Sequence, residues 1–282
     1  MNTRKLYTVA FEIVAIIIAF VMVFTFIPAV AEEPEEIYYN SEQMPVPMAI
    51  TDETLSFTRK EVLMDTTMSP KTPNYYDRDA SLKNGCAAVA GGIIVGYYDR
   101  TLENIIPNYS SVIKRGENFI YKQVDPYTQS VMNDLFVRMR VNVVNAGATE
   151  DDFKNGLKSY VSDNGYDISY KQYGKGNNIN YNAIANSFAK GEPVVLFLTM
   201  SNLITNLEIG TNKLTITSKD YNANHILIAN GIKRVRYYNG NNIIRTDTYL
   251  SVSSGFKSYV NNEYIWLEET LAVNDIVGVE IY

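Results

Sequence analysis

Residues 84–98 read Asn84-Gly85-Cys86-Ala87-Ala88-Val89-Ala90-Gly91-Gly92-Ile93-Ile94-Val95-Gly96-Tyr97-Tyr98. Apolar residues recur at i, i+4 spacing after an Asn-Gly turn, which predicts a helix from Cys86 to about Tyr98. Its small residues let other elements approach closely, but its glycines lower its intrinsic helix propensity. We therefore expect a helix that is stabilised by burial rather than by its own sequence.

Cys86 is the only cysteine of the 282-residue chain, and His225 is its only histidine. A thiol at the first turn of a helix lies near the positive end of the helix dipole, which favours the thiolate. The backbone N–H groups of that turn can stabilise an oxyanion. Imidazole titrates near neutral pH and can accept the thiol proton. The pair predicts a nucleophile and its base; the alternative is a small buried cysteine and an ordinary core histidine.

A third group is expected to orient the imidazole by accepting its other N–H. Asp247 is the candidate, because a hairpin turn at 239–242 would return its strand alongside the strand of His225. An ordinary carboxylate at a strand edge is the alternative interpretation of Asp247.

The order of elements predicts an α+β arrangement, helical first and sheet-rich second. Beyond the helix at Cys86, apolar periodicity and capping residues predict three further helices, and short apolar runs predict strands. The predicted helices are 128–139, 150–162 and 181–190, and the predicted strands are 193–199, 225–229, 234–238, 243–252 and 276–282.

The segment Asn84–Tyr98 resembles the catalytic helix of the C39-like branch of papain-fold cysteine peptidases, which show Gly-Cys, small residues and Gly-Tyr-Tyr. Residues 224–231 resemble that branch's Gly-His strand, with Asn224 in place of the usual glycine, and Asp247 matches the position of its orienting aspartate. The 139 residues between Cys86 and His225 also fall within the range of ~130–150 found in papain-type enzymes. The similarity covers about residues 73–282.

This resemblance implies a papain-like fold with a helical N-terminal lobe, the catalytic helix and a C-terminal antiparallel sheet. It implies a cysteine peptidase that hydrolyses peptide or protein substrates by a Cys-His-Asp acyl-enzyme mechanism, without cofactor or metal. The family's oxyanion glutamine is replaced by Ala80, and Asn74 or Asn84 could donate the missing hydrogen bond.

The N-terminus predicts export from the cell. A short basic head, an apolar run over 13–27 and the small-residue site Ala29-Val30-Ala31 are typical of a signal peptide covering residues 1–31. A retained membrane anchor is the alternative. Acidic and proline-containing residues predict a linker or a pro-segment over 32–70, followed by the peptidase domain at 71–282. We expect a secreted protein with no stable membrane partner.

The net charge is −6 and becomes about −7 without Arg4, Lys5 and Glu12. This acidic balance argues against nucleic acid as a partner. A cell-wall peptide amidase and a non-catalytic peptide-binding module remain the alternative functions. A thiol redox role lacks a second cysteine, and Asp77-x-Asp79 alone is too weak a signal for calcium.

Overall fold

The computed structural model describes residues 36–39, 49–116, 118–221, 223–256, 263–268 and 272–282. The predicted signal peptide at 1–31 lies outside these residues. Ile37–Tyr282 form one unit of the chain. Of the described residues, 45% lie in strands and 22% in helices. None of the helices in these ranges is both long and apolar enough to cross a membrane.

The four predicted helices are confirmed with small changes at their ends. They are α2 (Cys86–Tyr98), α3 (Pro126–Arg138), α4 (Glu150–Asp163) and α5 (Tyr181–Lys190). The strands, in chain order, are β1 (Ala49–Ser56), β2 (Arg59–Thr67), β3 (Val112–Arg115), β4 (Asn118–Tyr121), β5 (Ile168–Lys175), β6 (Asn178–Ile179), β7 (Val194–Ile209), β8 (Lys213–Tyr221), β9 (His225–Asn239), β10 (Asn242–Ser253), β11 (Glu263–Trp266) and β12 (Ala272–Ile281).

One antiparallel sheet contains all of these strands except the β3–β4 hairpin. Four of its pairings, β7–β9, β9–β10, β10–β11 and β11–β7, close into a ring. The outer strands attach to this ring: β2 pairs with β9, β12 and β8 pair with β7, and β1 pairs with β8. The predicted turn at 239–242 is confirmed, since Asn239 and Asn242 are paired and Gly240 has a φ of 59°.

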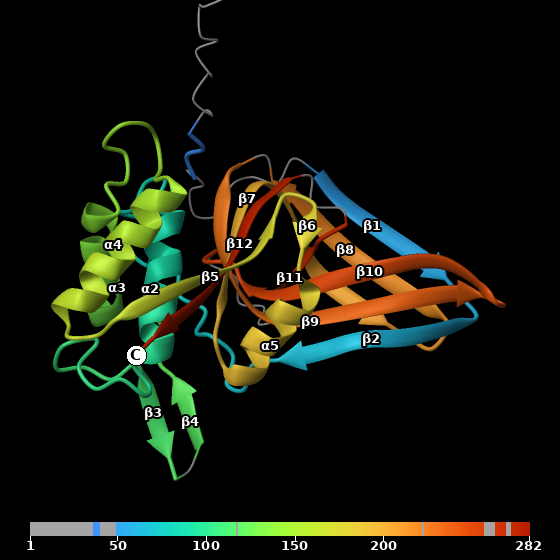
Figure 1. The fold of residues 1–282 in the computed structure, drawn as a ribbon, viewed down its shortest axis with the longest axis horizontal. Helices are drawn as coiled ribbons and strands as arrows, with labels where there is room; N and C mark the ends of the chain where they lie inside the picture. The colour runs from blue at the N-terminus through green and yellow to red at the C-terminus, as the bar shows by residue number, and fades with distance from the viewer. Residues whose placement is uncertain (1–35, 40–48, 117, 222, 257–262, 269–271) are drawn as a thin grey trace, which may run out of the picture. The chain divides into compact units, whose positions relative to one another are not determined.

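Helix α2 is the centre of the helical part. All 13 of its residues are buried, as its small residues and glycines predicted. It packs against α3, α4 and β9. In Figure 1, α2, α3 and α4 lie together, and strands β1, β2, β8, β9 and β10 extend away from them.

The apolar side chains form two clusters. The larger one surrounds α2 and the first halves of β7 and β9, and it includes Cys86 and Phe256. The smaller one lies among the far halves of the strands and includes Tyr237, Tyr249 and Trp266. Cys86, the predicted nucleophile, is thus part of the larger cluster. His225, the predicted base, stacks on Phe256 of the same cluster.

The papain-like α+β fold predicted from the sequence is wrong. The structure is mostly antiparallel sheet and has no helical N-terminal lobe among its described residues, because β1 and β2 precede α2 and join the same sheet as the C-terminal strands. Within the segment 32–70, predicted to be a linker or a pro-segment, residues 49–67 form β1 and β2. Both strands are largely exposed on the outside of the sheet, so their sequences carry few apolar residues and resemble a loop.

Candidate functional site

The candidate nucleophile, Cys86, is the first residue of α2 and is only 6% exposed. Asn84 precedes the helix with a left-handed φ of 58°, a conformation that asparagine tolerates better than most residues. The N-cap residue is Gly85, which has no side chain to bond to the first turn. The first helical hydrogen bond runs from Val89 N to Gly85 O. The N–H groups before Val89 therefore lie at the helix end that favours a negative charge.

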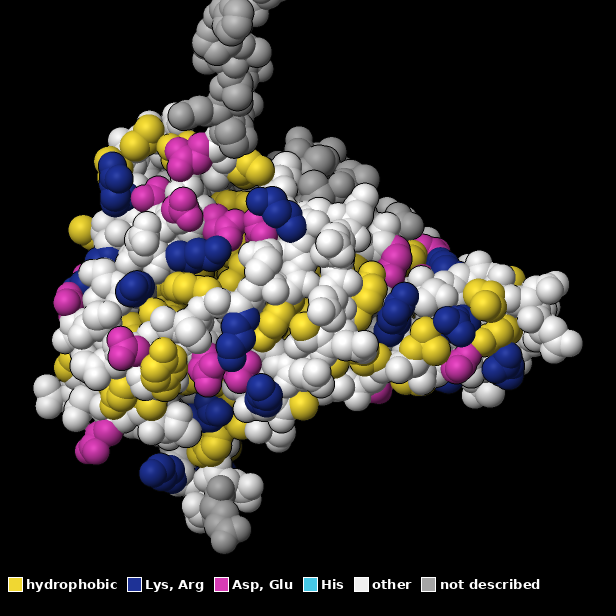
Figure 2. All heavy atoms as spheres, in the orientation of Figure 1, with side chains coloured by type: hydrophobic (Ala, Val, Ile, Leu, Met, Phe, Trp, Pro, Cys, Tyr) yellow, Lys and Arg dark blue, Asp and Glu magenta, His cyan; other side chains and the backbone are white. Residues whose placement is uncertain are grey.

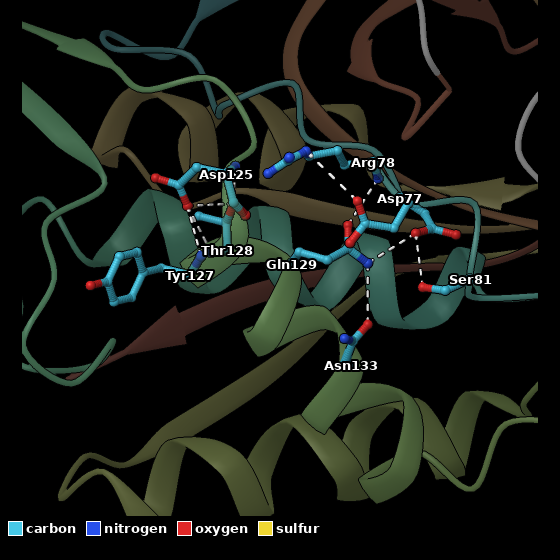
Figure 3. Close-up of polar contacts among 9 residues, drawn as sticks. Asp77, Arg78, Ser81, Asp125, Tyr127, Thr128, Gln129 and Asn133 are labelled. Atoms are coloured by element: carbon cyan, nitrogen blue, oxygen red, sulfur yellow. Dashed lines mark hydrogen bonds and ion pairs between the residues drawn. The ribbon is translucent and has the colours of Figure 1, made fainter.

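The loop that leads into α2 is held in place by Asp77. Its carboxylate accepts hydrogen bonds from Leu82 N at 2.7 Å and from Gln129 Nε2, on α3, at 2.9 Å. Gln129 also accepts from Arg78 N at 2.9 Å, so the loop and α3 are bonded in both directions (Figure 3). This network fixes the path of the chain nine residues before the candidate nucleophile.

The candidate base, His225, is the first residue of β9, where it pairs with Leu198 of β7. Its ring stacks on Phe256 with the centroids 4.5 Å apart and the planes 6° from parallel. Its Nε2 lies 2.8 Å from the carbonyl oxygen of Ser254. Because a carbonyl can only accept, Nε2 carries the proton and the neutral imidazole has its lone pair on Nδ1.

The charge state of His225 follows from its burial. The side chain is 3% exposed, and burial lowers its pKa to about 4, although the bond to the Ser254 carbonyl acts in the opposite direction. The imidazole is therefore neutral at neutral pH, which is the state that can accept a proton.

Residues 254–256 connect the imidazole to the start of α2. Ser254 and Phe256 contact His225, and Gly255 between them lies against Val89: a Cβ on Gly255 would be 3.0 Å from Val89 Cγ1. Gly255 has a φ of 76°, a conformation that side chains disfavour. The imidazole of His225 and the side chain of Val89, three residues after Cys86 on α2, thus contact the same three-residue turn.

A second group of residues around this turn was not predicted. Ser254 Oγ donates a hydrogen bond to the buried carboxylate of Glu263 on β11. Tyr221 packs on Phe256 with the ring centroids 5.3 Å apart, and burial followed by the charge of Glu263 raises the pKa of Tyr221. The Ser254 carbonyl could not be predicted, because no sequence motif marks a main-chain carbonyl. The one signal in the sequence is Gly255, which follows the predicted strand 243–252 and is typical of a turn.

The prediction that Asp247 orients His225 is wrong. Asp247 pairs with Val235, ten residues along β9 from the imidazole, which corresponds to roughly 30 Å of extended strand. Its carboxylate forms an ion pair with Arg245 at 2.9 Å and accepts a hydrogen bond from Tyr249 Oη at 2.7 Å. Asp247 is therefore a buried residue beside Val235 and Tyr249, which belong to the smaller cluster.

The two oxyanion candidates differ in their surroundings. Asn84 Nδ2 donates to Asn142 Oδ1 at 2.9 Å in an exposed hydrogen bond, so one N–H of this amide already has a partner. Asn74 is half-buried, with its side-chain oxygen inaccessible to solvent, in the segment that precedes Asp77. Ala80, which occupies the family's glutamine position, is exposed in a left-handed turn.

A cavity of about 230 Å³ lies among strands of the large sheet. It is lined by Lys71 and by residues of β2, β7, β9, β10 and β11, among them Asp65 and Lys233. Basic and acidic side chains are interspersed on the face of the molecule drawn in Figure 2. This face therefore carries no field of a single sign.

No protein-family model, no curated protein and no solved structure matches this chain.

Proposed function

We propose that the protein is a cysteine-type peptidase in which Cys86 is the nucleophile and His225 is the general base. The observation that supports this most directly is the turn 254–256, which contacts both the imidazole and the first turn of α2. The Ser254 carbonyl fixes the tautomer that accepts a proton on Nδ1, the role that sequence reasoning assigned to Asp247.

The proposed reaction is acyl transfer. His225 accepts the thiol proton, and Cys86 Sγ attacks the carbonyl carbon of a peptide bond. The oxyanion that forms is held by N–H groups at the start of α2. The C–N bond then breaks, the amine leaves with the proton from His225, and water hydrolyses the thioester to restore the free thiol.

The test is hydrolysis of a mixed peptide pool by the full-length protein, followed by mass spectrometry. His225→Gln can still donate a hydrogen bond to the Ser254 carbonyl but cannot act as a base, so we expect kcat/KM to fall about 10²-fold or more. Cys86→Ala should abolish hydrolysis, and iodoacetamide should inactivate the wild type by modifying Cys86. Hydrolysis that survives Cys86→Ala would contradict the proposal. Cleavage of cell-wall fragments but not peptides would indicate an amidase instead.

A further inference from the structure

A short segment, Ile37–Tyr39, is bonded to the residue before the N-cap of α4 and to the residue before His225. Tyr39 and Ala148 exchange two main-chain hydrogen bonds, at 2.8 Å and 3.1 Å, and Ala148 directly precedes the N-cap of α4. The side-chain amide of Asn224, the residue before His225, donates to the Tyr38 carbonyl at 2.7 Å. Most of this segment is thus recognised through its backbone, as extended peptide ligands are.

The side chain of Tyr39 is enclosed next to the catalytic pair. It is 2% exposed, and its ring lies 5.3 Å from that of Phe197, whose neighbour Leu198 pairs with His225. Burial raises the pKa of Tyr39, and among the charges that raise it further is that of Cys86. Tyr39 and Cys86 also belong to the same apolar cluster.

Polar groups surround the phenol oxygen. Asn274 Nδ2 donates to Tyr39 Oη at 3.1 Å and to Thr199 Oγ1 at 2.6 Å, which fixes the direction of the amide. The carboxyls of Glu150 and Asp275 also lie close enough to affect the pKa of Tyr39. An aromatic ring against Phe197 and a hydroxyl against Asn274 match these surroundings. Phenylalanine at this position would leave one N–H of the Asn274 amide without its acceptor.

We infer that Ile37–Tyr39 occupies the position of a peptide substrate, and that the enclosure around Tyr39 is a subsite selective for a tyrosine side chain. This inference rests on the proposed peptidase function for its consequence in catalysis. It gives the substrate class as extended peptides with tyrosine at this subsite.

The experiment compares full-length wild type, Tyr39→Ala and the matched control Tyr282→Ala, in which an exposed tyrosine is removed. The substrates are fluorogenic peptides that differ at one position, with tyrosine, phenylalanine, alanine or lysine. We expect Tyr39→Ala to raise kcat/KM for the tyrosine peptide by about 10-fold or more, because an intramolecular competitor is lost. Tyr282→Ala should behave as the wild type does.

Selectivity tests the subsite itself. In Tyr39→Ala we expect the tyrosine peptide to be preferred over the phenylalanine peptide by about 10-fold, and Asn274→Ala added to that variant should abolish the difference. An active Tyr39→Ala protein without preference for tyrosine would overturn the inference.

Two further experiments distinguish a failure of the subsite from a failure of the proposed function. Binding of the tyrosine peptide to Tyr39→Ala/Cys86→Ala, measured by fluorescence anisotropy, reports the subsite even if no variant hydrolyses peptides. Binding without hydrolysis in any variant would contradict only the proposed function. If Tyr39→Ala does not fold, a full-length chain with a specific protease site placed within 40–48 replaces it. Cutting that chain should raise the activity, and an active enzyme unchanged by the cut would overturn the inference.

Discussion

At the imidazole of His225, burial and one hydrogen bond act on the charge in opposite directions. Burial dominates and lowers the pKa to about 4, so the ring is neutral at rest. In the proposed mechanism this ring must hold a positive charge, which requires some hydration or a nearby negative charge. A thiolate at Cys86 would supply that charge, because proton transfer creates both ions together.

The depressed pKa predicts a specific dependence of stability on pH. An unfolded histidine titrates near 6.5, so between about pH 6.5 and 4 the unfolded chain binds a proton that the folded protein does not. The contribution of His225 to the free energy of unfolding should therefore fall as the pH falls, by about 3 kcal/mol between pH 7 and 4. Urea unfolding of wild type and His225→Gln at both pH values measures it. The buried carboxyls titrate in both proteins, so a difference that stays constant with pH would contradict the prediction.

We expect Asp247, unlike His225, to contribute to stability and not to activity. Asp247→Asn removes one partner of the ion pair with Arg245 and weakens the hydrogen bond from Tyr249. We expect a loss of about 1–3 kcal/mol in the free energy of unfolding. The rate at which iodoacetamide modifies Cys86 should stay unchanged, because Asp247 pairs with Val235, ten residues along β9 from His225. A fall in that rate or in kcat/KM, at full stability, would restore Asp247 to the site.

At the scale of elements, the helices could be predicted because they depend on local periodicity, whereas the pairing of the strands could not. The bounds of α2 and α5 were predicted to the residue, and α4 begins with a capping box formed by Thr149 and Asp152. The strands 225–229 and 234–238 are one strand, β9, and β8 was missed. Strand pairing is non-local, so no window of sequence shows that 59–67 pairs with β9 or that Asp247 faces Val235. Cys86 and His225 could be singled out because each residue type occurs once.

The glycines of α2 predict a contrast between two substitutions. An added Cβ at Gly96 would lie 2.3 Å from Cε2 of the Tyr75 ring, which is buried and rigid, so Gly96→Ala should cost about 1–3 kcal/mol. At Gly91 the Cβ would meet the terminal methyl of Met139 at 2.8 Å, a flexible group that can turn aside. The gain in helix propensity, about 1 kcal/mol, should then keep Gly91→Ala close to wild type. Chemical denaturation of both variants checks this, and equal losses would refute the contrast.

At the scale of the molecule, strands near both ends of the chain complete one sheet. β2 pairs with β9 from Arg59 to Thr67, and Phe57 packs on Tyr237 with the ring centroids 4.9 Å apart. Lys60 Nζ donates to the carbonyls of Ile209 and Gly210, at the end of β7. These contacts make 49–67 part of the folded unit.

If the protein is exported as its N-terminus predicts, its processing should leave β1 and β2 in place. We expect signal cleavage after Ala31, and any later activating cleavage between Tyr39 and Ala49, since loss of β2 would expose the edge of β9. Intact-mass measurement of the protein from culture medium locates its N-terminus. A chain that begins at residue 71 should fail to fold, as judged by circular dichroism. An active, folded species that begins after residue 70 would show that β1 and β2 are a removable pro-segment.

The orienting carbonyl of Ser254 has a consequence for genetics. Replacing each side chain with alanine leaves every main-chain carbonyl in place. In the proposed site, an alanine scan for activity would therefore detect Cys86 and His225 but not the carbonyl of Ser254. Substitutions that displace this carbonyl should concentrate at Gly255, where a positive φ and the contact with Val89 exclude a side chain. Random mutagenesis scored for activity would therefore mark, as one of its most sensitive positions, a residue that has no functional group.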